Sequence, residues 1–178
     1  MSRHHDFRIR DARPEDGDKI RAVTLAAYEQ YADVMPHWQM YRRQHLLATL
    51  EEQGPEERIV AERNGEIIGS VLLYPATATV YETETANAGW PEIRLLAVPP
   101  SVRGQGVGKA LLDECVRRAR GAGATTLGLH SEDIMEAAVH LYQRTGFVRA
   151  PETDFNPSET AVVKGYRLSL DDTGAAPE

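Results

Sequence analysis

The amino-acid sequence predicts a mixed α/β fold, and three features of the chain lead to this prediction. An apolar segment at 95–98 meets two prolines and a loop with three glycines, directly after which an amphipathic helix begins. Two alternating segments, 58–63 and 66–74, flank Asn64-Gly65, the pair favoured in the two-residue type I′ turn of a β-hairpin. Predicted strands and helices also alternate along the chain, which suits a mixed sheet with helices packed on it.

The N-terminal half is expected to contain one strand, two helices and the hairpin. Residues 7–10 alternate in polarity and predict the first strand. An acidic helix start at 14–18 is followed by apolar residues at helical spacing, and Pro36 ends this helix. A second helix is predicted over 38–52, before the hairpin. Gly69, inside the second arm of the hairpin, predicts a bulge or the close approach of a helix.

The C-terminal half is expected to alternate strands and helices around the glycine-rich loop. The predicted elements are a long loop at 75–89, a central strand at 91–98, a helix at 107–120, a strand at 125–130, a helix at 133–144 capped by Gly146, and a closing antiparallel pair at 147–149 and 162–170. Together the elements predict one domain over residues 1–170, followed by a short disordered tail at 171–178.

Composition excludes several classes of protein. The chain has 178 residues, 42% of them hydrophobic, which is typical of a folded domain and too many for disorder. No apolar run is long enough to cross a bilayer, and the first residues lack the apolar segment of a signal peptide. The single cysteine excludes a disulfide framework, no cluster has metal-ligand spacing, and the formal net charge of −7 argues against nucleic-acid binding. We therefore expect a cytoplasmic protein without metal, nucleic-acid or membrane partners, with the oligomeric state open and a homodimer among the alternatives.

The glycine-rich loop has the pattern of an anion-binding site. A strand, a glycine turn and a helix together point backbone N–H groups at one spot, where the helix macrodipole adds partial positive charge. A P-loop is excluded, because Arg103 and Ala110 stand where that motif needs Gly and Ser or Thr. A dinucleotide fingerprint is excluded as well, because Lys109 replaces its third glycine. The loop therefore predicts a phosphate-bearing ligand of another kind.

Two motifs resemble the acetyl-CoA signature of the GCN5-related N-acetyltransferase (GNAT) superfamily. The first is Arg103-x-x-Gly106-x-Gly108 with Leu96-Ala97-Val98 in front, and the second is Leu141-Tyr142 followed by Gly146-Phe147. The resemblance implies a mostly antiparallel central sheet, flanked by about four helices and splayed at its central strands. It also implies acetyl-CoA as cosubstrate. The residues implied to bind it, with the pantetheine arm on the strand and the pyrophosphate on the loop, are Leu96, Ala97, Val98, Arg103, Gly104, Gln105, Gly106, Val107, Gly108 and Lys109.

Two side chains are candidates for catalysis. By resemblance, Tyr142 is the acid that protonates the departing thiolate, although its ring also fits the apolar stripe of its helix. Glu92, two residues before Arg94 on the central strand, is the candidate base. It could equally pair with Arg94 and be structural, with ordered water as the proton relay. A main-chain N–H near Val98 would meet the oxyanion.

Other chemistry-bearing residues are expected to be structural or to line the cleft for the acceptor. Cys115 lies on the apolar face of its helix and His130 ends a strand, so both are expected in structural roles. Trp38, Tyr41 and the loop from 74 to 90 are the candidate walls of the acceptor cleft.

These observations predict an N-acetyltransferase that moves acetyl from acetyl-CoA directly to a primary amine, on a small molecule or on a protein. No Cys/His or Ser/His pairing in the sequence suggests a covalent intermediate. Two alternatives stay open: a non-catalytic CoA-binding module, and an acyltransferase for a longer acyl-CoA. The sequence leaves the amine unidentified.

Overall fold

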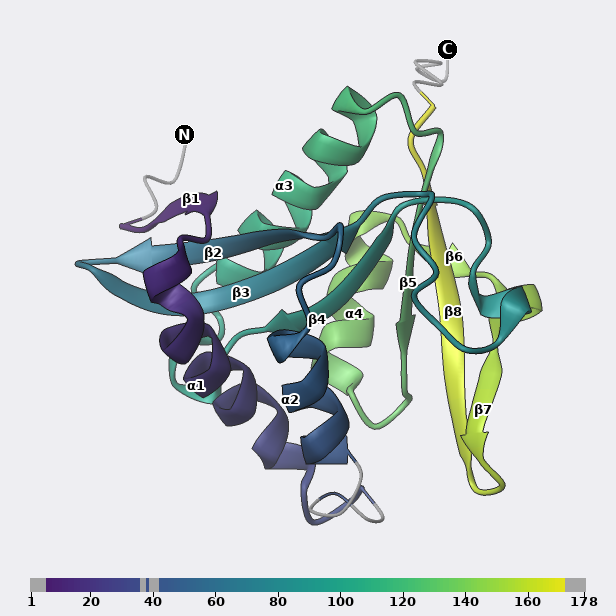
Figure 1. Cartoon of the computed structure of the whole chain (residues 1–178), viewed down its shortest axis with the longest axis horizontal. Helices are drawn as coiled ribbons and strands as arrows, with labels where there is room; N and C mark the ends of the chain where they lie inside the picture. The colour runs from purple at the N-terminus through teal and green to yellow at the C-terminus, as the bar shows by residue number, and fades with distance from the viewer. Residues whose placement is uncertain (1–5, 36–37, 39–41, 172–178) are drawn as a thin grey trace.

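The computed structural model describes residues 6–35, 38 and 42–171 and has a strongly twisted sheet at its centre (Figure 1). The strand order is β1-β2-β3-β4-β5-β8-β6, and β7 pairs with β8 outside this path. The strands are β1 Arg8–Asp11, β2 Glu57–Arg63, β3 Glu66–Tyr74, β4 Glu92–Ala97, β5 Thr126–Ser131, β6 Val148–Arg149, β7 Phe155–Ser158 and β8 Ala161–Ser169. Among the described residues, only β4 and β5 run parallel, so the prediction of a mixed, mostly antiparallel sheet is confirmed.

Helices cover both faces of this sheet. The first face carries α1 Gly17–Tyr28 and α2 Arg43–Glu51, and the opposite face carries α3 Val107–Gly121 and α4 Glu136–Thr145 (Figure 1). The main apolar core lies between the sheet and the second pair, where Leu111, Leu112 and Leu127 are fully buried. The expected number of about four helices is confirmed. Within the described residues, none of the helices combines the length and hydropathy needed to span a lipid bilayer.

The hairpin forms as its turn residues predict. Asn64 and Gly65 both have positive φ, 51° and 81°, which the type I′ turn requires at its two central positions. The β2–β3 register shifts between Ala61 and Glu62, so a bulge lies next to Gly69. A Cβ on Gly69 would lie 2.8 Å from Cγ1 of Val107 on α3. Both expectations for this glycine, a bulge and a close helix, are therefore confirmed.

The sheet opens between its two central strands. Pairing of β4 with β5 is limited to Glu92 with Gly128 and Ile93 with Leu129, although both strands continue beyond these pairs. On its other side β4 bulges against β3, and Leu95 within the bulge has a φ of 50°. The bulge turns β4 away from β5 (Figure 1), which leaves the β5-facing main chain of residues 94–97 without a strand partner. The splay expected from the resemblance is present.

Some boundaries and one strand differ from the prediction. The second predicted helix covers 43–51, and part of its predicted start, like Pro36 and the tail 172–178, lies outside the described residues. The segment between the predicted strands at 147–149 and 162–170 contains a further strand, β7, in which Phe155 pairs with Val163. This short edge strand was not predicted, because it contains Pro157 and its apolar and polar residues do not alternate. The predicted closing pair exists as β6 with β8, but β8 pairs mainly with β5.

Cys115 is expected to be inert in the folded protein. Its side chain is 0% exposed, and burial raises the pKa of its thiol to about 12. Because the thiolate is the nucleophilic form, alkylation at about pH 8 should be negligible until the protein unfolds. Mass spectrometry after iodoacetamide treatment, with and without denaturant, checks this. Rapid alkylation of the native protein would contradict the buried position.

Candidate active site

The loop before α3 presents a continuous row of free backbone donors. The N–H groups of Gly104, Gln105, Gly106, Val107, Gly108 and Lys109 have no hydrogen-bond acceptor within the described residues, and the first bonded N–H after them belongs to Ala110. Gly104 and Gly106 make this possible, because their φ angles of 74° and 83° are strained for most other residues. Six adjacent donors at the positive end of a helix dipole favour an anion with several oxygens. This row is named the N–H cradle below.

Side chains anchor the cradle to the rest of the fold. Nη1 of Arg103 donates to the side-chain amide oxygen Oε1 of Gln30 at 2.7 Å, which ties the loop to the segment after α1. Gln105 accepts from Arg63 of β2 at 2.8 Å. Lys109 extends along α3 and pairs with Asp113. A Cβ on Gly108 would lie 3.2 Å from Leu141 of α4, so this glycine allows α3 and α4 to pack closely.

The open edge of β4 lies directly before the cradle in the chain. Ala97 is fully buried and pairs with Ser70 of β3, while Leu96 and Val98 are half-buried and pack against the main core. Because the β5 side of this segment has no strand partner, an extended ligand with amide groups can add there as a further strand. The predicted binding residues 96–98 and 103–109 thus lie on one continuous stretch around the opening.

Tyr142 combines a packed ring with an uncommitted hydroxyl. The residue is 6% exposed, and its ring lies against Phe147 with 6.1 Å between the ring centres. Burial raises the pKa of the phenol well above its usual value, and Tyr28 and Tyr31 raise it further. A Cβ on Gly108 would lie 3.2 Å from Leu141, the residue before Tyr142, and 3.6 Å from Val98, so this part of α4 lies beside the start of α3 and the end of β4. Its hydroxyl makes no hydrogen bond within the described residues and stays protonated at neutral pH.

Glu92 is held in a buried hydrogen-bond network. Its Oε1 atom accepts from the Tyr81 hydroxyl at 2.8 Å and lies 2.6 Å from Nδ1 of His130. The other ring nitrogen of His130, Nε2, lies 2.9 Å from the carbonyl oxygen of Thr153. A carbonyl can only accept, so Nε2 carries a proton, and Glu92 and Nδ1 share one more. His130 therefore has the hydrogen-bonded position expected of a structural histidine. The alternative pairing of Glu92 with Arg94 does not occur.

Removing Glu92 is expected to destabilise the fold strongly. The Glu92 and His130 side chains are only 5% and 3% exposed, and the network joins β4 and β5 to the loop that carries Tyr81. Glu92→Ala should lower the free energy of unfolding by about 3 kcal/mol or more, because it leaves a buried polar partner unpaired. Urea unfolding measures this, with the exposed Glu152→Ala as control. Equal stability of the two variants would contradict the network.

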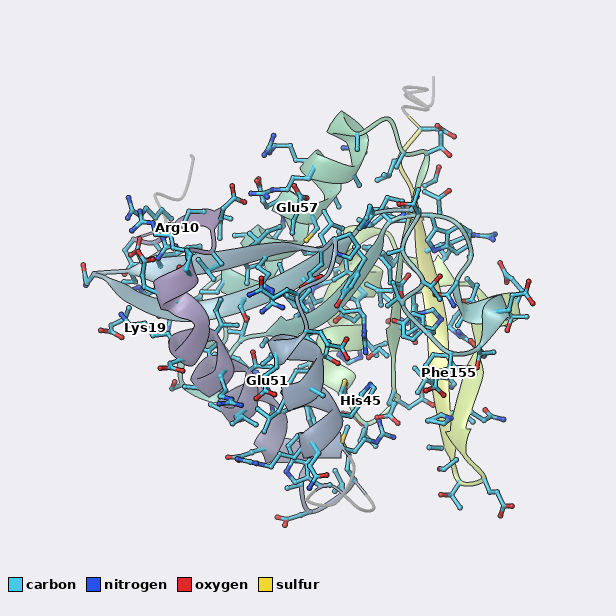
Figure 2. All side chains as sticks on the ribbon, in the orientation of Figure 1. Arg10, Lys19, His45, Glu51, Glu57 and Phe155 are labelled. Atoms are coloured by element: carbon cyan, nitrogen blue, oxygen red, sulfur yellow. The ribbon has the colours of Figure 1, made fainter. Side chains whose placement is uncertain are left out.

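The face of the sheet beneath α2 carries the remaining candidate lining residues. Arg94 lies on this face of β4, with Cζ 5.2 Å from the ring centre of Tyr81 and 6.0 Å from that of Tyr74. His45 lies on the side of α2 turned toward β5 (Figure 2), and burial and the charge of Arg94 lower its pKa. Trp38 is buried, and its indole N–H has no hydrogen-bond partner among the described residues. Tyr41, the other aromatic candidate, lies outside the described residues.

Fold and loop together define the class of protein. The fold of this chain, a mixed sheet with helices on both faces, is similar to that of solved acetyltransferases. One of them, a GNAT-family acetyltransferase from Brucella melitensis in complex with acetyl-CoA, resembles this structure with a TM-score of 0.60 and 25% identity. The match covers 94% of this chain and 90% of that one.

The sequence comparisons identify the family. Residues 24–147 match the model of the acetyltransferase (GNAT) family, and the chain belongs to this family. Aminoalkylphosphonate N-acetyltransferase from Salmonella typhimurium is 30% identical over 140 residues, which are 78% of this chain and 83% of that protein. Mycothiol acetyltransferase from Propionibacterium freudenreichii is 37% identical over 71 residues, 39% of this chain and 23% of that protein. The chain spans about a quarter of the length of the mycothiol acetyltransferases it matches. The family predicted from the motifs is confirmed.

Proposed function

We propose that this protein is an acetyl-CoA-dependent N-acetyltransferase that acts on a primary amine by direct transfer. The observation that carries the proposal is the N–H cradle beside the open edge of β4. Membership of the GNAT family supports the same activity. The names of the matched relatives, for aminoalkylphosphonates and for mycothiol, agree with acetyl transfer and leave the acceptor of this chain open.

The donor set fits the chemistry of an acyl-CoA. The six N–H groups of the cradle bind the oxygens of the diphosphate, and Arg103 and Lys109 add positive charge at its edge. The main chain of Leu96, Ala97 and Val98 pairs with the amide groups of the pantetheine arm. This arrangement brings the thioester to the opening in the sheet, near Tyr142.

The proposed reaction is a single displacement at the thioester carbonyl. The neutral amine attacks the carbonyl carbon, a C–N bond forms, and the C–S bond breaks. A main-chain N–H near Val98 stabilises the oxyanion. Tyr142 donates its phenolic proton to the departing thiolate and regains one from solvent. The amine passes its proton to the Tyr81 hydroxyl, beside Arg94, and this hydroxyl passes its own proton to Glu92. Ordered water is the alternative relay.

A screen of amines for release of free CoA from acetyl-CoA tests this proposal. Acetylation of at least one amine, with product detected by mass spectrometry, is the expected result. CoA binding without release for any amine would favour the non-catalytic module. A competition between acetyl-, propionyl- and succinyl-CoA tests the alternative of an acyltransferase for a longer acyl-CoA. Exclusive use of a longer acyl chain would contradict acetyl transfer.

A further inference from the structure

Arg94 differs from the other partly buried arginines of the protein. Within the described residues its guanidinium forms no ion pair with a carboxylate, and it lies beside the rings of Tyr74 and Tyr81. The other partly buried arginines of the described chain each pair with a carboxylate: Arg10, Arg21, Arg42, Arg43, Arg58, Arg63, Arg118 and Arg149. In a chain with a net charge of −7, acidic partners are plentiful, so this exception is notable.

Two acidic side chains near Arg94, Glu92 and Glu132, are engaged by other residues. Glu92 shares a face of β4 with Arg94, but its carboxylate is engaged by Tyr81 and His130. Glu132 and Arg94 both affect the pKa of Tyr28. The Glu132 carboxylate accepts hydrogen bonds from both terminal nitrogens of Arg42. The tyrosine rings attract the cation of Arg94 through their faces, and none of its five N–H donors is paired with a carboxylate of the described residues. The guanidinium fork is therefore free to bind an anion.

Arg94 lies at the opening in the sheet, on the face where we expect the amine acceptor to bind. Arg94 lies immediately after the last β4–β5 pair at Ile93 and begins the bulge that turns β4 away. It points to the face covered by α1 and α2, because its neighbour Ile93 packs in the core on the α3 and α4 face and successive side chains of a strand alternate. Tyr142, the proposed acid, comes from α4 on the other face.

We propose that Arg94 binds an anionic group of the acceptor, so that the substrate is an amine that also carries a carboxylate, phosphonate or phosphate. The inference rests on the proposed function and narrows its substrate class. A guanidinium forms two parallel hydrogen bonds with such oxyacid groups, and the partly buried setting strengthens them. The nearby rings of Tyr74 and Tyr81 help to hold the guanidinium in place.

Matched amines test the proposal with the wild-type protein. The panel contains β-alanine, 2-aminoethylphosphonate and phosphoethanolamine as anionic acceptors, and β-alaninamide and propylamine as neutral ones. We expect kcat/KM for the best anionic acceptor to exceed that of the neutral amines by about 10- to 100-fold, as for a charge-assisted hydrogen-bonded pair. The three anionic compounds distinguish carboxylate, phosphonate and phosphate.

Variants of Arg94 separate this role from cosubstrate binding. Arg94→Met should remove the preference for the anionic acceptors while leaving CoA affinity in calorimetry unchanged, and Arg94→Lys should restore part of the preference. Arg117→Met, an exposed position on α3, is the control and should behave as wild type. Equal use of neutral and anionic amines by the wild type would overturn the proposal and leave the transferase function standing. A loss of CoA affinity in Arg94→Met would also overturn it, whereas a wild-type protein that binds no CoA defeats the proposed function itself.

Discussion

Replacing Tyr142 by phenylalanine is expected to lower kcat by about 100- to 1,000-fold while leaving the affinity for CoA nearly unchanged. The substitution keeps the ring, which packs against Phe147, and removes only the hydroxyl. Because this hydroxyl has no hydrogen-bond partner within the described residues, its loss breaks no internal hydrogen bond. Stability should therefore stay close to that of wild type, and the loss should appear in the chemical step.

The control for this prediction is a second buried tyrosine of the same core. Tyr166→Phe removes a hydroxyl from a residue that is 4% exposed and packs beside Arg149, and it should keep its activity. Steady-state kinetics and calorimetry with CoA compare the two variants. Full activity of Tyr142→Phe would remove Tyr142 from the mechanism.

The pH dependence gives the same assignment a second test. The acid must be protonated to act, and burial raises the pKa of Tyr142 well above its usual value near 10. Its protonated form therefore persists through neutral and mildly alkaline pH and is lost only above that usual value. Titration of Tyr142 should not reduce kcat between about pH 7 and 9.

Placing a carboxylate in the N–H cradle is expected to weaken CoA binding by about 100-fold or more. Gly106 precedes the first residue of α3 and has a φ of 83°, a conformation that Asp and Asn tolerate better than other residues. In Gly106→Asp, the new charge would face the diphosphate. Each pair of unit charges at about 5 Å repels by about 3 kcal/mol at an effective dielectric constant of about 20.

Gly106→Asn is the matched control, because it has nearly the same shape and no charge. Both residues are favourable at a helix start, so both variants should fold with stability similar to wild type. Calorimetry should rank CoA affinity as wild type, then Asn, then Asp, with the gap between Asn and Asp shrinking at high salt. Equal affinity of the Asp and Asn variants would show that no anion binds at this loop.

Most of the fold was predictable because local chemistry decides it. Asn64-Gly65 is suited to two successive positive φ angles, and the glycines before α3 allow a loop that frees its N–H groups. The strand β7 was not predictable, because its Pro157 and lack of alternation look like a loop, and only pairing with β8 makes it a strand. The bulge at Leu95 likewise depends on packing against β3, since nothing in a leucine favours a positive φ.

The candidate site was predictable where its residues are contiguous, and less so where distant segments meet. The cradle and the open strand lie on one stretch, so sequence spacing describes them. The network of Tyr81, Glu92 and His130 requires the parallel register that sets Glu92 opposite Gly128, and the sequence does not specify it. Arg94 did give a signal, as a charged residue in an apolar strand, but its freedom from carboxylates is visible only in the folded chain.

The central claim is that the N–H groups of residues 104–109 hold the diphosphate of CoA. The most direct measurement is the chemical shift of these six backbone amides during titration with CoA, with pantetheine, which lacks the diphosphate, as comparison. We predict large, saturable shifts for the six amides with CoA and small ones with pantetheine. Unshifted amides at saturating CoA, or equal shifts with both compounds, would contradict the claim.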